Sequence, residues 1–392
     1  MAPAVDIETP ADVIQGLKAK AKQIDHSIFP DGLKTTGQHP PLYDKLYPYS
    51  AFPKHIEGPT EWKAEDYSSN PERWVHQFSE DELDGISKAA DSFIQLGLPL
   101  TGISKENFRL PGLEPALETM RRELLNGKGF ILYKGFPVDE WGIPKSAVAY
   151  MGLGVYIGYP VSQNGHGHIL GHVKDLGEDS TQIDKVRIYR TNARQFFHAD
   201  DCDIVGLLCL SKAEFGGESD VASIHNVWNI LQAERPDVAE LLTQPIWYFD
   251  RKGEVSEGEE PYIRTSVFYL ETADPAQPAR EQRVYCKWDP YYVRSLTRFS
   301  DQGIIPALSP AQQEATRIRG DFVANSHTLH ARTAYRDFGP DSGKPRRHLL
   351  RLWLAVPQDE GGWRLPFWDS DEKKRGGIQV NDNAPVARLE AD

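Results

Sequence analysis

The chain has 392 residues, of which 40% are hydrophobic and 26% are charged, and its formal net charge is −13. This composition is typical of a soluble globular protein, and the negative charge without any long basic run argues against a protein that binds nucleic acid or anionic membranes. Any anionic ligand must therefore be held by individual arginine or lysine side chains.

The cysteines and the N-terminal segment bear on the cellular compartment. The three cysteines, Cys202, Cys209 and Cys286, are too few for a disulfide framework and lack the CxxC spacing of a zinc site. The N-terminal residues contain no apolar run of the kind found in secretory signals, and no stretch approaches the roughly 18 consecutive apolar residues of a membrane helix. We therefore expect a cytoplasmic protein without a membrane partner.

The first part of the chain is expected to form an arm and two helices. Residues 1–75 are rich in proline, tyrosine and lysine and show little periodicity, which predicts an arm that covers the core. No internal repeat or linker divides residues 76–392, so we expect one domain there. Ser79 and Glu82 form a capping box ahead of the first helix, and Gly127 ends the second.

A short strand over residues 129–137 and a helix over residues 146–157 are followed by a mainly β pattern. Expected strands lie near residues 186–189, 204–210, 219–223, 246–249, 267–270, 282–285, 321–323 and 348–356; expected helices cover residues 227–242, with a restart at Pro236, and the residues after Ser309 and Pro310; residues 254–260 and 337–344 are expected as exposed loops. Many short strands with a few helices indicate an α+β protein with a mainly β core, a sandwich or jelly roll, and helices packed outside it.

Residues 189–210 contain the first candidate metal ligands. His198 and Asp200 are two residues apart, and in an extended segment such residues project to the same side. A His-x-Asp pair often occurs by chance, so a third ligand is needed, and both His327 and His330 are available. Two imidazoles and one carboxylate form a facial triad that suits ferrous iron, which must also bind a chelating cosubstrate and O2. A zinc ion coordinated entirely by protein side chains requires a fourth ligand.

Residues 346–354 show strict alternation, which predicts a strand. Leu350, Leu352 and Leu354 share one face, and Arg347, Leu349, Arg351 and Trp353 share the other. The two arginines of that face are roughly 13 Å apart along the strand. Guanidinium groups in apolar surroundings are costly to desolvate unless an anion meets them. Each of the two therefore pairs with an acidic side chain, lies at an exposed edge, or binds a ligand carboxylate through its two-pronged donor.

Four motifs in this order resemble a known family. They are His-Ala-Asp at 198–200, Gly-Gly-Glu-Ser at 216–219, Leu-His-Ala-Arg-Thr-Ala-Tyr at 329–335 and Arg-Arg-His-Leu-Leu-Arg-Leu-Trp-Leu at 346–354. The chain resembles the taurine dioxygenase/TfdA-like oxygenases, in particular fungal members described as clavaminate synthase-like. The resemblance implies a double-stranded β-helix fold. It also implies Fe(II), 2-oxoglutarate and O2 as cofactor and cosubstrates, with ascorbate as the reductant in vitro.

The resemblance also implies roles for individual residues. His198, Asp200 and His330 correspond to the iron ligands that form the catalytic centre, which leaves His327 as a structural neighbour. Arg347 corresponds to the residue that holds the distal carboxylate of 2-oxoglutarate, and Ser219 to the hydroxyl residue that assists it.

Substrate contacts are expected from another set of residues. Arg351 corresponds to a position that binds a sulfonate or carboxylate of the substrate in several members of the family. Gln163 and Asn164 are expected to face the pocket, and Asn192 to form a hydrogen bond with the substrate. The nearby histidines His166, His168 and His172 fit an active-site loop better than a second metal site, and Asp201 and Asp203 fit structural roles.

The expected reaction is oxidation of a C–H bond in a small, anionic substrate such as an amino acid, another carboxylate or a sulfonate, with release of succinate and CO2. Hydroxylation is the default outcome, and desaturation or ring closure uses the same chemistry. Two alternatives remain at this point. One is a non-catalytic β-helix sensor, which is expected to have a broken ligand set, and the other is a cupin-type metalloenzyme that does not use 2-oxoglutarate. No nucleic-acid partner is expected, and a homo-oligomer remains open.

Overall fold

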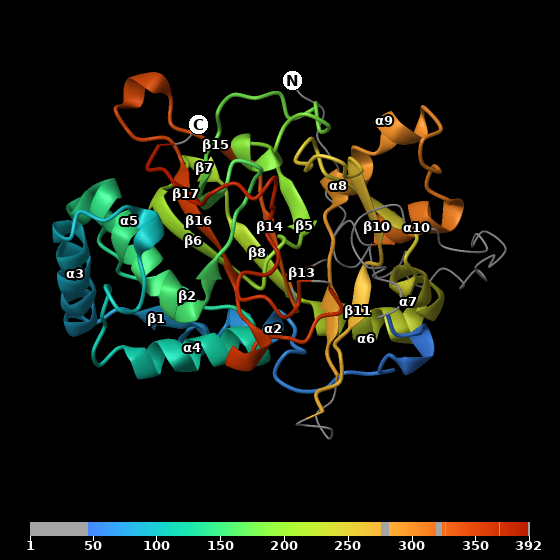
Figure 1. Ribbon diagram of the computed structural model, residues 1–392, viewed down its shortest axis with the longest axis horizontal. Helices are drawn as coiled ribbons and strands as arrows, with labels where there is room; N and C mark the ends of the chain where they lie inside the picture. Colours follow the sequence, from blue (N-terminus) through green and yellow to red (C-terminus); the bar gives the residue numbers. More distant parts are fainter. Residues whose placement is uncertain (1–45, 276–281, 319–323, 326, 368, 391–392) are drawn as a thin grey trace.

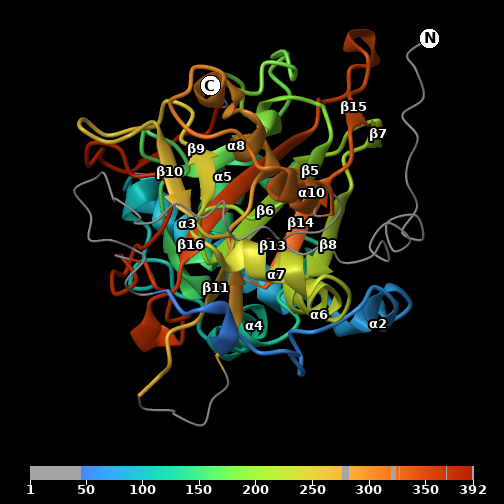
Figure 2. The same cartoon turned by 90° about the vertical axis from the view of Figure 1, so that its right-hand side faces the viewer.

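The computed structural model describes residues 46–275, 282–318, 324–325, 327–367 and 369–390 (Figure 1). Helices α3, α4 and α5 lie on one side of a central group of strands, and α7, α9 and α10 lie on the other. Figure 2 views the molecule from the side of α7 and α10, with the strands behind them. Among the described residues, no helix has the length and hydrophobicity needed to cross a bilayer.

Nine α-helices lie in the described part of the chain: α2 (Glu65–Ser68), α3 (Glu80–Gln95), α4 (Glu114–Asn126), α5 (Val138–Ile157), α6 (Ile224–Glu234), α7 (Pro236–Thr243), α8 (Pro290–Arg294), α9 (Thr297–Ser300) and α10 (Pro310–Ile318). The strands of the same part are β1 (Val75–Gln77), β2 (Leu132–Lys134), β3 (Tyr159–Pro160), β4 (His168–Val173), β5 (Gln195–His198), β6 (Ile204–Ser211), β7 (Phe215–Gly216), β8 (Ser219–Ser223), β9 (Trp247–Asp250), β10 (Tyr262–Thr265), β11 (Phe268–Leu270), β12 (Val284–Cys286), β13 (Ala324–Asn325), β14 (Thr328–Arg332), β15 (Tyr335–Arg336), β16 (His348–Ala355) and β17 (Val386–Ala387).

Two sheets position the candidate iron ligands and the candidate substrate-binding arginine. In the first, β16 pairs antiparallel with both β6 and β4, so that Leu350 lies opposite Leu208 on one side and His172 on the other. In the second, β14 pairs antiparallel with both β5 and β8, so that His330 lies opposite His198 and Val221. Each sheet therefore has a late strand in its middle, flanked by strands from an earlier part of the chain.

Strand β16 is buried on both faces. Its leucines Leu350, Leu352 and Leu354 belong to the core that β16 shares with α3, α4 and α5. Helix α5 approaches closely at Gly154, where a Cβ atom would lie 2.7 Å from a methyl carbon of Leu352. Arg351 and Trp353, which alternate with the leucines, are also buried. The predicted strand is thus confirmed from residue 348 to residue 354, while residues 346 and 347 precede it.

The helix boundaries follow local signals. Glu82 donates its backbone N–H to the Ser79 hydroxyl, and the Glu82 carboxylate accepts from the Ser79 N–H, so the predicted capping box is confirmed. Helix α4 ends at Gly127, and the helix expected over residues 227–242 is divided into α6 and α7 at Pro236. Proline at the first position of α7 needs no N–H partner, which allows the restart.

Several local predictions were wrong. Residues 188–190 form a 3₁₀ turn rather than the expected strand, and the strand expected over residues 129–137 is limited to β2. Residues 168–173, expected as a loop because of their glycines and histidines, form β4, since pairing with β16 overrides weak local preference. Glu254, expected in an exposed loop, pairs with Arg187 and has a side chain only 19% exposed. The strand expected near residues 321–323 lies outside the described residues.

A second core lies around α6 and α7. Phe52 and Ile56, from the described part of the N-terminal segment, are buried against it. The Trp228 Nε1–H donates to the Pro53 carbonyl at 2.9 Å, and the Ile56 N–H donates to the Asn229 side chain at 2.8 Å. This segment therefore packs on the core instead of extending away from it.

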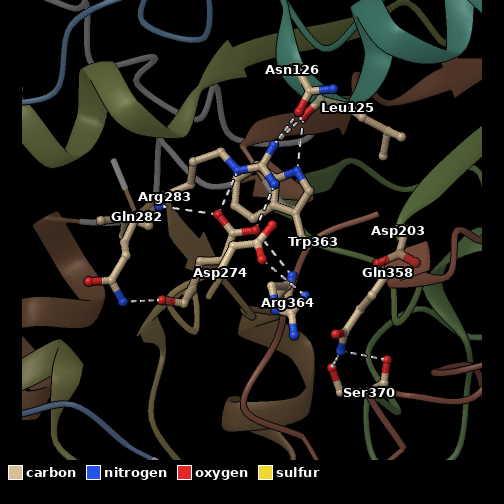
Figure 3. A network of polar contacts seen from close by, with 12 residues as sticks. Leu125, Asn126, Asp203, Asp274, Gln282, Arg283, Gln358, Trp363, Arg364 and Ser370 are labelled. Atoms are coloured by element: carbon tan, nitrogen blue, oxygen red, sulfur yellow. Dashed lines mark hydrogen bonds and ion pairs between the residues drawn. The ribbon is translucent and has the colours of Figure 1, made fainter. Parts of the chain in front are cut away.

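A polar network ties α4 to the late part of the chain (Figure 3). Arg283 donates to the Leu125 carbonyl at 3.1 Å, forms an ion pair with Glu271 at 2.7 Å, and stacks over the Trp363 ring at 3.9 Å. The Trp363 Nε1–H donates to the same Leu125 carbonyl at 2.9 Å. The end of α4 is thereby fixed although its helix stops there.

The packing of α5 leads to a test of the fold. Gly152→Ala is expected to destabilise the protein by about 1–3 kcal/mol, because the added Cβ would lie 2.3 Å from the buried Phe108 ring. The matched control is Gly85→Ala in α3, where the added methyl meets open space and helix propensity predicts a gain of roughly 0.5–1 kcal/mol. Denaturant unfolding measures both changes, and equal stability of the two variants contradicts this packing.

Candidate active site

His198, Asp200 and His330 meet between the two sheets. Of the described residues, they form the one group of three whose nitrogen and carboxylate atoms could share a metal, with one ligand atom from each lying within 4.8 Å of the others. The His198 Nε2 atom is 3.6 Å from one oxygen of Asp200, and the His330 Nε2 atom is 3.7 Å from the other. The two rings are 4.1 Å apart because the strands place them directly opposite each other.

The His198 ring is oriented for coordination through Nε2. Its Nδ1 atom lies 2.9 Å from the Phe196 carbonyl, which can only accept, so Nδ1 carries the proton. The Gln195 amide nitrogen is 2.9 Å from Nε2 and donates to its lone pair, so this contact must be replaced when Nε2 binds a metal. A backbone bond of this kind is what normally sets the tautomer of a histidine that binds metal.

Asp200 follows β5 and is surrounded by groups that favour its anionic form. The Trp353 Nε1–H donates to Asp200 Oδ2 at 2.9 Å, and Arg351 Nη1 is 3.6 Å from the same oxygen. Although burial opposes ionisation, Arg351 and the two histidines hold the pKa of Asp200 below its usual value. Its neighbours Asp201 and Asp203 pair instead with Lys287 and Arg375, at 2.8 Å and 3.0 Å.

Neutral imidazole is the form that binds a metal, and the site favours it at His330. Burial, with a further contribution from His198, lowers the pKa of His330 to about 3. The other available histidine, His327, is not part of the group: it stacks on Trp363, and its Nε2 lies 3.1 Å from the Gly127 carbonyl.

The donor set fits the iron implied by the resemblance. Two imidazole nitrogens and one carboxylate converge in a buried place, and the described part of the chain adds no cysteine or fourth ligand to them. Such a set leaves coordination positions open for other ligands and is typical of non-haem Fe(II) oxygenases.

A cavity opens beside Asp200. Its lining includes Arg351, Tyr189, Lys252 and Asp289. Arg351 is 5% exposed, donates to the Gln163 side chain at 2.8 Å and stacks on Tyr189 at 4.6 Å. Gln163 also lines the cavity, but its amide nitrogen donates to the Ile169 and Arg351 carbonyls, so its polar atoms already have partners.

Asn164 and Asn192, also expected to contact the substrate, do not line the cavity beside Asp200. Asn164 closes a turn by accepting from the His166 and His168 backbone N–H groups, and its amide nitrogen lies 3.1 Å from His168 Nδ1. Asn192 is exposed and contributes its backbone carbonyl to the Tyr335 N–H.

Arg347 directly precedes β16 and contacts Gly217, two residues before Ser219, which opens β8 and is exposed. Arg347 is 5% exposed, donates to the Gly217 carbonyl at 3.1 Å and retains one buried nitrogen, Nη1, without a hydrogen-bond partner. Gly217 adopts a positive φ of 79°, and a Cβ there would lie 2.6 Å from Arg347 Nε, so glycine is required for this approach.

Lys252 is a cavity residue that sequence reasoning missed. Its ammonium group lies 5.1 Å from the centre of the Tyr292 ring and forms no ion pair or hydrogen bond with the described residues, whereas its backbone N–H donates to Asp250. Burial lowers the pKa of Lys252 to about 8. Its φ of 48° is left-handed, a strained backbone conformation for a residue other than glycine. The one feature of the local sequence that marks this position is the Lys-Gly pair after β9, and such a pair is also common in ordinary turns.

The contact between Trp353 and Asp200 can be tested directly. Trp353→Phe is expected to weaken Fe(II) binding by about 10- to 100-fold, because a hydrogen bond that orients a metal ligand is lost. Trp363→Phe is the matched control, since it removes an indole bond of the same 2.9 Å length far from the triad. Anaerobic titration with Fe(II) measures both, and equal affinities exclude this role for Trp353.

A triad of two histidines and one aspartate in a mixed α/β fold, with two of the three residues buried, is typical of a non-haem iron oxygenase. A family model described as "Taurine catabolism dioxygenase TauD, TfdA family" matches residues 97–316, more than half of the chain. The chain belongs to this family and is an Fe(II)- and 2-oxoglutarate-dependent oxygenase. The matched range ends before His330 and Arg347, so their placement comes from the structure.

Individual relatives agree with this family. The chain is 28% identical over 338 residues to "FR-33289 synthase" of Streptomyces rubellomurinus, covering 80% of this chain and 93% of that protein. It is 26% identical over 328 residues to "Taurine hydroxylase-like protein SAT17" of Stachybotrys chartarum, covering 78% and 80%. Its fold is similar to that of an asparagine oxygenase solved with Fe(II), hydroxyasparagine and succinate, with a TM-score of 0.52, 15% identity and coverage of 72% and 94%.

Proposed function

We propose that His198, Asp200 and His330 hold the Fe(II) of this oxygenase. The observation that carries the proposal is the convergence of one ligand atom from each residue within 4.8 Å, in a buried place. With 2-oxoglutarate and O2, iron in such a site supplies the oxidising power that attacks a C–H bond, with succinate and CO2 as products.

The distal carboxylate of 2-oxoglutarate is assigned to Arg347 and Ser219. Arg347 is a buried cation with a nitrogen that lacks a partner, and a carboxylate is the anion that a guanidinium group binds best. Ser219 lies on the face of β8 that is shared with His330, as its register with β14 requires. Both residues thus orient the cosubstrate from the side opposite its chelating end.

The remaining residues orient the triad and exclude water. Trp353 and Arg351 fix the Asp200 carboxylate, and the Phe196 carbonyl fixes the His198 ring. The buried surroundings of His198 and Asp200 keep bulk water from the reacting groups, which protects the site from unproductive oxidation.

We infer a small substrate that carries an anionic group. Two cations of the cavity already have partners: Arg187 pairs with Glu254, and Arg351 with Asp200 and Gln163. Lys252 then offers its ammonium to the anion, and Arg351 orients the substrate beside the triad. An amino acid, another carboxylate or a sulfonate fits, with hydroxylation as the default reaction.

Further proposals concern the whole chain. The sheets centred on β16 and β14 form the two halves of a double-stranded β-helix, with residues 76–392 as one domain and residues 1–75 as an arm. The family relationship and the likeness to asparagine oxygenase support the β-helix. A cytoplasmic location agrees with a sequence that has three cysteines.

The reaction is tested with purified protein, Fe(II), ascorbate and 2-oxoglutarate. A panel of amino acids, carboxylates and sulfonates is expected to include one that stimulates succinate formation, and chelation of the metal is expected to abolish it. Under anaerobic conditions, 2-oxoglutarate is expected to give a charge-transfer band only when Fe(II) is present. Absence of that band contradicts the assigned cosubstrate site, whatever the substrate.

A further inference from the structure

Arg332 is a buried cation whose donors are only partly used. The residue is 5% exposed, and its Nη2 donates to the Thr191 carbonyl at 3.1 Å and to the Ala193 carbonyl. Its Nε and Nη1 atoms are buried without a hydrogen-bond partner, and no carboxylate of the described residues lies within ion-pair distance. Buried donors without partners are costly, so a ligand is expected to satisfy them.

The position of Arg332 relates it to the iron site. It follows His330 by two residues on β14, so both side chains project from the same face. On the neighbouring strand β8, Arg332 lies directly opposite Ser219, and His330 lies opposite Val221. Residues paired in this way have neighbouring side chains, which places the Arg332 and Ser219 side chains next to each other.

Arg332 and Arg347 both lie beside the Tyr335 ring. The guanidinium carbon of each lies 4.9 Å from the centre of the Tyr335 ring. A guanidinium group keeps its proton in proteins, so both residues carry a positive charge at neutral pH. Arg347 also retains an unpartnered buried nitrogen, Nη1. Asp175 and Asp337 act on these cations from nearby, but both form their ion pairs with Arg346. Neither buried guanidinium group therefore has an anion in contact, which points to a ligand that supplies one.

We propose that Arg332 and Arg347 together bind the distal carboxylate of 2-oxoglutarate, with Ser219 between them, so that this end of the site binds dicarboxylates even without metal. The inference rests on the proposed assignment of that carboxylate to Arg347. It adds a second cation and predicts that 2-oxo acids lacking a distal carboxylate are rejected, because they would leave two buried guanidinium groups unpaired. The product succinate retains this carboxylate and is expected to bind to the same pair.

The test measures succinate binding to protein freed of metal with a chelator. Arg332→Gln is expected to weaken succinate binding by about 10- to 100-fold in calorimetric titration, since a charge-assisted contact is lost. The KM for 2-oxoglutarate is expected to rise with kcat little changed, and the Fe(II) affinity to stay the same. Arg332→Lys, which keeps a positive charge, is expected to retain part of the affinity.

Arg121→Gln is the matched control. Arg121 is also 5% exposed, has a buried Nε without a partner and donates to the Glu360 backbone carbonyl, but it lies in α4. Unlike Arg332, it already has an anion, the Glu360 carboxylate at 3.0 Å. Its replacement is expected to lower stability without changing succinate or 2-oxoglutarate binding. A purely structural arginine at position 332 is expected to behave in the same way.

The outcomes separate this inference from the proposed function. If Arg332→Gln binds succinate as the native protein does, or if the metal-free native protein binds no succinate while the iron-dependent band forms, the two-arginine site is wrong and the iron site stands. If the band itself does not form, the proposed cosubstrate site fails as well. If Arg332→Gln does not fold, Arg332→Lys is measured instead. A lysine variant that binds succinate with native affinity and still rejects 2-oxobutyrate would show that the guanidinium group at position 332 is not needed.

Discussion

Asp200→Asn is expected to abolish iron-dependent turnover. The substitution removes the one carboxylate of the triad while keeping its shape and an oxygen for the Trp353 indole. Mutating a residue that hydrogen-bonds to a metal ligand lowers metal affinity by roughly 10- to 100-fold. Losing a ligand itself is expected to lower the Fe(II) affinity by more than this. Arg351 also loses its buried anion, so we expect the metal-free protein to lose about 3–5 kcal/mol of stability.

Asp201→Asn is the control for this variant. The adjacent carboxylate is 37% exposed and pairs with Lys287, so its loss is expected to leave Fe(II) affinity and succinate formation unchanged. Anaerobic Fe(II) titration and denaturant unfolding of both variants give the comparison. Native-like iron binding by Asp200→Asn means that another residue supplies the third ligand.

Arg347→Met is expected to raise the KM for 2-oxoglutarate by roughly 30-fold or more. Removing one partner of a buried charged pair costs on the order of 2–5 kcal/mol, which corresponds to this change in affinity. Methionine retains much of the apolar stem beside Tyr335, so the fold is expected to persist. Steady-state kinetics at saturating substrate, and the anaerobic charge-transfer titration, measure the effect.

Arg346→Met provides the matched comparison. Arg346 is the adjacent arginine, but its side chain is 46% exposed, and it pairs with the largely covered carboxylates of Asp175 and Asp337. Exposed pairs contribute little, so this variant is expected to bind 2-oxoglutarate normally. A similar KM for both variants would mean that the cosubstrate carboxylate lies elsewhere.

The parts of the fold set by local signals were predictable. The capping box at Ser79, the stop at Gly127 and the restart at Pro236 depend on neighbouring residues alone. The alternation of β16 also identified its two faces, with Leu350, Leu352 and Leu354 on one and Arg351 and Trp353 on the other, although both faces are buried. His198 and Asp200 were found as a pair because their spacing is local.

Other parts depend on contacts between distant segments. The residue types alone left His327 and His330 open, and only the resemblance favoured His330; the register of β14 with β5 places His330 opposite His198. Lys252 reaches the cavity from the turn after β9, and the strained backbone at that turn is not visible in the composition. The partners of Gln163 likewise became clear only when β16 was placed beside residues 163–169.

The complete burial of β16 has a consequence for changing what the enzyme oxidises. Because both faces of this strand are occupied, libraries that randomise it are expected to contain mostly unfolded proteins, even where a substitution suits a new substrate. The turn that carries Lys252 is only partly buried and belongs to no strand or helix, so it tolerates variation better. If Lys252 binds the substrate as proposed, directed evolution of this oxygenase is best begun at the turn, where a change of substrate contact costs the fold least.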